Sequence, residues 1–187
     1  MINWDLLHAI REIYMREEAI DNLFFVNKVP RKKLANAVKS YADNMGQDEQ
    51  IIFLYDDTIF GSAKEGFILT THALYSKNSF LAGNSAKIDE ILRMTYDEGG
   101  WLRVLSIKVQ TEHDDFEMHL TQVHDSSKKN ALFNVLNQTV QLLCRKTDFG
   151  VESKNSFIKP VFSPHCVNCG APVSRGARKC EYCDTSL

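Results

Sequence analysis

The sequence predicts an α+β fold with an N-terminal helical hairpin, an antiparallel β-barrel closed by a C-terminal helix, and a small four-cysteine zinc ribbon. Apolar residues first recur at helical spacing, short β-rich segments then follow at intervals of about ten residues, and two CxxC pairs end the chain. The expected parts are residues 1–48 for the hairpin, 49–147 for the barrel and its helix, 148–163 for a linker, and 164–187 for the ribbon.

The hairpin prediction depends on two amphipathic segments. Residues 3–25 place Leu6, Ile10 and Tyr14 on one side of a helix. A second helix is expected to begin at Pro30, whose fixed φ suits a first turn, and to end at Gly46. Because the connection between them is short, we expect the two helices to be antiparallel neighbours.

From Gln50 onward the hydrophobic period changes to that of strands. The expected strands are residues 51–55, 66–70, 73–76, 87–96, 101–111 and 116–120. Asp125 and the two serines after it are expected to cap a long helix that ends near Lys146. Its apolar residues recur at helical spacing and give it one broad apolar face, which predicts a helix that packs on the strands.

This order of elements resembles bacterial pleckstrin-homology-like (PH-like) domains. The resemblance extends over about residues 50–146 and is carried by the apolar first strand Ile51-Ile-Phe-Leu-Tyr55, by Gly66-Phe-Ile-Leu-Thr70, and by Leu74-Tyr75. It implies a non-enzymatic binding domain that has an open edge or groove beside the closing helix, and it implies self-assembly into a homo-oligomer. A peptide or another subunit is expected to pair at that edge by strand addition.

The chain departs from the phosphoinositide-binding members of this superfamily in the loop after the first strand. Those proteins carry several Lys or Arg residues there, whereas residues 58–65 contain only Lys64. We therefore expect no phosphoinositide ligand. The closing helix also lacks the Trp that is common in eukaryotic PH domains.

Four cysteines near the C-terminus have the spacing of a structural zinc site. Cys166 and Cys169 form one CxxC pair, and Cys180 and Cys183 form the other. Two such pairs supply the tetrahedral thiolates that Zn²⁺ prefers, and the metal stabilises a segment too short to fold alone. The tail is similar to the short zinc ribbons at the ends of many bacterial proteins, with Val167 and Asp184 where Pro and Gly are usual. His165 could replace one cysteine as a ligand, but four well-spaced thiolates make this unnecessary. A redox function of the CxxC pairs is the alternative.

The remaining candidate site residues have simpler interpretations. Asp56 and Asp57 are a candidate carboxylate pair, but adjacent strand residues point to opposite faces, so we expect them to be turn formers. We expect Cys144 to be a small buried apolar residue. The histidines are expected at the surface, and they are His8, His72, His113, His119, His124 and His165.

Arg31, Lys32 and Lys33 form the one dense basic cluster and are the candidate anion or partner contact. They occupy the first turn of a helix, where positive charge opposes the helix dipole, so a solvated helix end is the alternative. Together with Arg175, Arg178 and Lys179 of the ribbon, they define a second function hypothesis, a nucleic-acid-binding regulator.

Composition restricts the functional classes. The net charge is −2, and no apolar run reaches the length of a membrane span. The N-terminus does not have the pattern of an export signal, and four cysteines occur as two CxxC pairs. We therefore expect the protein to be in a reducing cytoplasm. The sequence thus predicts a zinc-containing interaction or scaffold protein with protein partners and without enzymatic activity. An enzyme that uses Asp56, Asp57 and a histidine is the third hypothesis.

Overall fold

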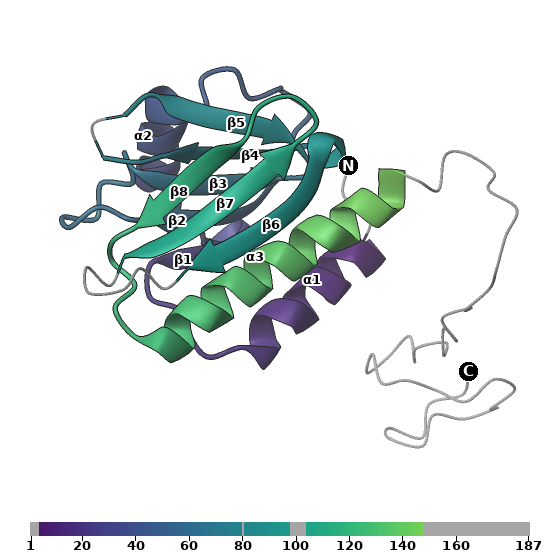
Figure 1. Ribbon diagram of the computed structural model, residues 1–187, viewed down its shortest axis with the longest axis horizontal. Helices are drawn as coiled ribbons and strands as arrows, with labels where there is room; N and C mark the ends of the chain where they lie inside the picture. Colours follow the sequence, from purple (N-terminus) through teal and green to yellow (C-terminus); the bar gives the residue numbers. More distant parts are fainter. Residues whose placement is uncertain (1–3, 80, 98–103, 148–187) are drawn as a thin grey trace, which may run out of the picture. The chain divides into compact units, whose positions relative to one another are not determined.

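The computed structural model describes residues 4–79, 81–97 and 104–147 (Figure 1). The chain divides into two units, Met1–Val151 and Glu152–Leu187, and every described residue lies in the first. Its helices and strands are, in order, α1 (Trp4–Arg16), β1 (Leu23–Phe25), η1 (Val26–Lys28), α2 (Arg31–Tyr41), β2 (Ile51–Asp56), β3 (Gly66–Thr70), β4 (Ala73–Lys77), β5 (Gly83–Lys87), η2 (Ile88–Glu90), β6 (Ile91–Asp97), β7 (Leu105–Thr111), β8 (Phe116–Leu120) and α3 (Ser126–Thr147). The fold is therefore α+β, as predicted.

The described strands form two antiparallel sheets. Sheet A has the order β1-β2-β3-β4-β5, and sheet B has the order β6-β7-β8. Between them the short 3₁₀ helix η2 carries the chain from one sheet to the other. These pairings correct the prediction of one closed barrel, because the described strands of sheet A do not pair with those of sheet B.

Sheet A is covered on both faces, which explains why β2 and β3 are almost continuously apolar. On one face of the sheet, side chains such as Leu54 and Ile68 pack with Ala37 and Tyr41 of α2. The side chains on the opposite face of sheet A lie in the main core, which also contains apolar residues of sheet B, α1 and α3. The members of that core from β2 to β4 are Ile52, Phe53, Tyr55, Phe67, Leu69 and Leu74. Burial on both faces requires a run of apolar residues where a half-exposed strand would alternate.

The predicted N-terminal hairpin is wrong. The first helix ends at Arg16, and Leu23–Phe25 then forms β1, which pairs antiparallel with β2. The helix α1 lies beside α3, and α2 packs on the opposite face of sheet A (Figure 1). Hydrogen bonds from Ser127 to Glu18 and from Lys128 to Asp21 join the start of α3 to the segment after α1. The two helices therefore bury their apolar residues in two different clusters of the fold.

The other expected elements are largely confirmed. Predicted strands 51–55, 66–70, 73–76 and 116–120 correspond to β2, β3, β4 and β8. The predicted strand 87–96 is wrong in part, because β5 ends at Lys87 and β6 begins only at Ile91. The long helix is confirmed as α3, and its cap is Asp125, whose carboxylate accepts a hydrogen bond from the backbone N–H of Ser127 at 2.8 Å.

No helix in the described part of the chain combines the length and the apolar character that crossing a bilayer requires. The linker, the ribbon cysteines Cys166, Cys169, Cys180 and Cys183, and the basic residues Arg175, Arg178 and Lys179 lie outside the described residues.

Candidate functional site

The carboxylate of Asp56 organises the loop between β2 and β3. It is fully buried and forms an ion pair with Lys33 of α2. It also accepts hydrogen bonds from the backbone N–H groups of Thr58 and Ala63, both at 3.0 Å. Burial alone would raise the pKa of Asp56, but hydrogen bonds from Lys33 and Thr58 and the charge of Lys33 outweigh it, so the pKa lies below its usual value.

The carboxylate of Asp57 joins the two sheets. It accepts hydrogen bonds from the backbone N–H groups of Thr121, at 2.8 Å, and Gln122, at 2.9 Å, and from the hydroxyl of Thr121 at 3.0 Å. These donors follow β8, whereas Asp57 follows β2. Burial raises the pKa of the Asp57 carboxyl, and the hydrogen bonds from Thr121 and Gln122 offset this only in part.

The two aspartates therefore diverge, as their adjacent positions predict. Asp56 contacts α2 and its own loop, and Asp57 contacts the end of sheet B. The five histidines of the described residues are all exposed, and His165 lies outside them. Both carboxylates thus have structural partners, which favours the turn-forming interpretation over an acid–base pair.

The basic cluster is divided by its surroundings. Arg31 and Lys32 are exposed, as expected for a helix end. The Lys33 side chain is only 21% exposed, because it pairs with buried Asp56 and lies over the ring of Phe24, 5.2 Å from the ring centre. The charge of Lys33 is therefore already compensated by Asp56, and contact of the cluster with an anion or partner stays a prediction. This removes one of the cations on which the nucleic-acid hypothesis depends.

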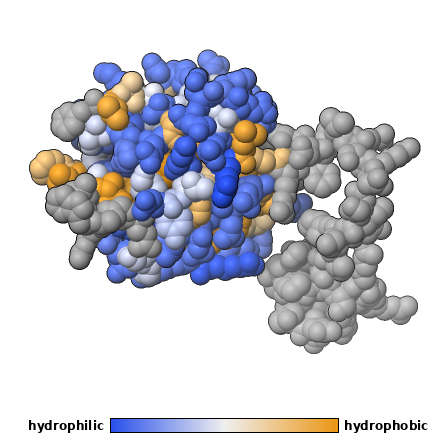
Figure 2. All heavy atoms as spheres, viewed as in Figure 1, coloured by the Kyte–Doolittle hydropathy of each residue, from blue (hydrophilic) through white to orange (hydrophobic). Residues whose placement is uncertain are grey.

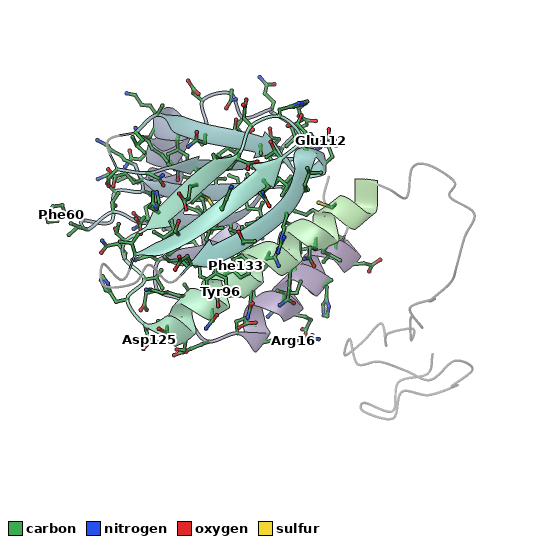
Figure 3. All side chains as sticks on the ribbon, viewed as in Figure 1. Arg16, Phe60, Tyr96, Glu112, Asp125 and Phe133 are labelled. Carbon is green, nitrogen blue, oxygen red and sulfur yellow. The ribbon has the colours of Figure 1, made fainter. Side chains whose placement is uncertain are left out.

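A cleft between β6 and α3 is the candidate binding site. It has a volume of about 420 Å³. Its lining comes from consecutive residues of β6 and from one side of α3, namely Ile91, Leu92, Arg93, Met94, Asn137, Val140, Gln141 and Cys144. The rings of Tyr96 on β6 and Phe133 on α3 pack against each other in a tilted arrangement, with their centres 4.5 Å apart (Figure 3).

Leu92 makes the mouth of this cleft apolar. The register of the β6–β7 pair shifts between Ile91 and Arg93, so Leu92 has no partner on β7. Its side chain is 66% exposed, although neighbouring Ile91 and Met94 are buried in the core. Such bulges re-aim a side chain without ending the strand. The bulge does leave a sign in the sequence, because the inward-facing Ile91 and Met94 are three positions apart where strict alternation would space them by two. This irregularity was not recognised in the predicted strand.

Cys144 has a different environment from the one expected. It is half-buried rather than buried, and its thiol donates a hydrogen bond to the carbonyl oxygen of Ile88 at 3.1 Å. It lines the floor of the cleft together with Val140. The cysteine therefore helps to join the end of α3 to η2.

A second hollow, of about 400 Å³, lies beside β4 and β5 and includes Glu49, His72 and Tyr75. The carboxylate of Glu49 accepts hydrogen bonds from the hydroxyls of Tyr75, at 2.8 Å, and Thr70, at 2.5 Å. Burial and this carboxylate raise the pKa of the Tyr75 hydroxyl. The polar groups here have protein partners, so this hollow is a weaker candidate than the β6–α3 cleft.

Within the described ranges, no group of three or more His, Cys, Asp or Glu side chains has the arrangement of a metal site. Metal binding therefore remains a prediction for Cys166, Cys169, Cys180 and Cys183, outside those ranges. Comparison with known proteins gave no matching family model, no matching curated protein and no matching solved structure.

Proposed function

We propose that this protein is a non-enzymatic, zinc-containing interaction protein that binds an extended segment of a protein partner in the cleft between β6 and α3. The observation that carries the proposal is that β6, an edge strand among those that the structure describes, borders a cleft lined by both apolar and polar side chains. An added strand would pair with the backbone of β6, and its side chains would enter the cleft. The arrangement of strands followed by α3 also supports the PH-like assignment.

Of the two edges of sheet B, the β8 edge is already engaged. The amide of Asn78 donates to the carbonyl of Glu117 and accepts from the N–H of His119, both at 2.8 Å. Asp57 binds the two N–H groups that follow β8. Side chains that follow β2 and β4 thus bond to the β8 edge. A partner strand would therefore add at β6 in this sheet.

The edges of sheet A are less suitable for strand addition. At one edge, β1 has only three residues. At the other, β5 has the sequence Gly-Asn-Ser-Ala-Lys, with mostly exposed side chains and no large apolar residue. Short and polar edges are the usual protection against pairing with another chain. The seven-residue β6, with exposed Leu92, lacks both kinds of protection.

The chemistry of the cleft specifies a partner segment. Ile91, Met94 and Val140 offer an apolar floor, so an aliphatic or aromatic side chain is expected there. Asn137 and Gln141 can bond to the peptide backbone, and exposed Arg93 favours a carboxylate at one end. The expected ligand is therefore an extended peptide with one large apolar residue and one acidic residue.

The peptide-binding proposal can be tested by selecting ligands from a random peptide library with the full-length protein. Leu92→Glu places a charge at the apolar mouth of the cleft and should weaken binding of a selected peptide at least tenfold, or about 1.4 kcal/mol. Titration calorimetry measures the effect.

Met15→Ser is the matched control, because Met15 is also exposed, at 65%, but lies on α1. Equal affinity in Leu92→Glu and the native protein would contradict the proposal. If the occupant is a second copy of the chain, Leu92→Glu will instead lower the apparent molecular mass in light scattering.

We further propose that Cys166, Cys169, Cys180 and Cys183 hold one Zn²⁺ as a structural tetrathiolate site in a reducing cytoplasm. Their spacing supports this assignment. Elemental analysis should find one zinc per chain, and replacing Cys183 with serine should reduce zinc retention strongly under dialysis against a chelator. Cys144→Ser is the control, because Cys144 lies in α3, and it should retain the metal fully. A native protein without zinc, or equal retention in both variants, would refute the site.

A further inference from the structure

Cations gather on and around α2. In a chain with a net charge of −2, residues 28–41 contain five Lys or Arg residues and no acidic residue. Of these five, Lys33 is already paired with buried Asp56. The fold adds Lys64, in the loop between β2 and β3, and Lys77, at the end of β4. We call the other six cations the basic face, and they are Lys28, Arg31, Lys32, Lys39, Lys64 and Lys77.

Hydrogen bonds bring three elements of the basic face together at Ser40. The hydroxyl of Ser40 donates to the carbonyl oxygen of Lys64 at 2.8 Å and accepts a hydrogen bond from the ammonium group of Lys77 at 3.2 Å. One turn earlier on α2, the amide of Asn36 donates to the carbonyl oxygen of Ser62 at 2.8 Å. The loop after β2 and the end of β4 are therefore fixed against one side of α2, and their cations join those of the helix.

The outer surface of α2 presents its cations at helical spacing. Arg31, Ala35 and Lys39 recur every four residues, so they lie on one side of the helix, and all three are exposed. A helix rises 1.5 Å per residue, so Arg31 and Lys39 are about 12 Å apart along its axis. The side chain between them is the methyl group of Ala35, which allows an extended chain to lie close to the helix between the two cations.

The cations of the basic face lack carboxylate partners within the part of the chain that the structure describes. The ion pairs between described residues include none of the six. Glu65, which follows Lys64, instead accepts a hydrogen bond from the hydroxyl of Ser79 at 2.6 Å. Asp43 lies beyond the C-terminal end of α2. Like charges that are held together on one surface attract an anion, and binding of that anion relieves their repulsion.

The distribution of these charges favours a polymer over a small anion. Neither of the two clefts described above is lined by a cation of the basic face. The six side chains come instead from η1, α2, the loop after β2, and β4. Charges that are spread over four elements can contact several phosphates of one chain, whereas a single phosphate group would meet only a few of them.

An exposed aromatic ring lies in the same loop as Lys64. Phe60 is 96% exposed and projects from the margin of the molecule (Figure 3). Apolar side chains gather at that margin, whereas the face over sheet B is mainly hydrophilic (Figure 2). The bonds from Thr58 and Ala63 to buried Asp56 fix the loop, so little conformational entropy remains to be lost on binding. Such a ring offers a stacking surface to an unpaired base.

We propose that the basic face binds single-stranded nucleic acid, with its cations on successive phosphates and Phe60 stacked on a base. Cations that follow the backbone, together with an aromatic side chain that stacks on bases, are the two contributions that hold single strands on proteins without regard to sequence. An acidic peptide or an anionic bilayer supplies negative charge but no unpaired base. The site is separate from the cleft between β6 and α3, because α2 covers the face of sheet A that turns away from the main core.

Fluorescence anisotropy of the full-length protein with labelled oligouridine and oligothymidine of about 15 nucleotides tests the proposal. The native protein should bind both oligonucleotides more tightly than polyglutamate of equal charge or vesicles that contain phosphatidylglycerol. Arg31→Ala with Lys39→Ala should weaken binding at least tenfold. The same variant should reduce the slope of the logarithm of the affinity against the logarithm of the salt concentration by about 0.7 for each cation removed.

Phe60→Ser tests the stacking contact. It should weaken binding of both oligonucleotides at least fivefold. Binding of a duplex of the same length should be unchanged, because the bases of a duplex are already stacked and paired. Phe60 is exposed, so this variant should unfold at the same temperature as the native protein.

The matched control is Arg11→Ala with Arg16→Ala, which removes two exposed cations from α1 and lowers the net charge by the same amount. It should bind the oligonucleotides as the native protein does. The proposal is overturned if the native protein binds neither oligonucleotide, or if the α2 variant binds them as well as the native protein or the α1 variant. Equally tight binding of polyglutamate or of anionic vesicles would also overturn it.

Discussion

Replacing Gly66 with alanine should lower the free energy of unfolding by about 4 kcal/mol. Gly66 begins β3 with a φ of 121°, a conformation that strains any residue with a side chain. A methyl group there would lie 2.1 Å from the carbonyl oxygen of Tyr55 and 3.0 Å from the backbone nitrogen of Asp57. Both atoms are backbone of the adjoining segment, so no change of rotamer relieves the contact. Equilibrium denaturation in urea measures the loss.

The matched substitution is Gly46→Ala. A methyl group at Gly46 meets side-chain atoms and no backbone atom. The carboxylate end of Asp48, at 3.0 Å, can move aside, and the Glu49 carboxylate, at 3.3 Å, needs to shift by only a few tenths of an ångström. We expect a change below about 1 kcal/mol. If Gly66→Ala lowers the free energy of unfolding no more than Gly46→Ala does, the close contact between β2 and β3 at Gly66 is contradicted.

Asp57→Ala should cost about 3 kcal/mol of stability. The substitution removes the acceptor for the N–H groups of Thr121 and Gln122 and for the Thr121 hydroxyl. Hydrogen bonds to a charged group contribute roughly 1.5–3 kcal/mol each, and water that reaches the half-buried Thr121 and Gln122 replaces part of that contribution. Because these bonds join the end of sheet B to sheet A, we also expect faster hydrogen exchange along β8.

Two further variants test the cause of this loss. Asp57→Asn keeps one carbonyl oxygen and should cost about half as much. Asp21→Ala removes a carboxylate that is 79% exposed and paired with Lys128 at the surface, so it should change stability by less than about 1 kcal/mol. Asp57→Ala and Asp21→Ala would have similar effects only if the link between the sheets contributed nothing.

The fold could be predicted where burial leaves a pattern in the sequence. The apolar runs of β2 and β3 and the helical period of α3 mark elements that face the core. The strand β5 was missed because its side chains are polar and exposed, so its position is set by pairing with β4 and not by its own pattern. The strand β1 was read as helix because Leu23, Phe24 and Phe25 continue the apolar pattern of the preceding segment. Pairing with β2, which the sequence pattern does not show, makes these residues a strand.

The sites were less predictable, because they depend on which distant residues meet. The sequence marked Arg31, Lys32 and Lys33 as one cluster, but only the fold pairs Lys33 with Asp56, which is 23 positions away. The loop after β2 was judged from its own residues 58–65, whereas the fold places α2 beside it through the hydrogen bond from Asn36 to Ser62. The divergence of Asp56 and Asp57 was foreseen, because it follows from strand geometry alone.

The proposed function depends on binding of a partner segment between β6 and α3. Backbone amide NMR of the full-length protein, titrated with a library-selected peptide, tests it most directly. If the peptide binds in this cleft, the largest chemical-shift changes will fall on Ile91–Asp97 and on residues 137–144 of α3. Largest changes along β1 or β5, or in the cysteine-containing tail, with β6 unaffected, would contradict it.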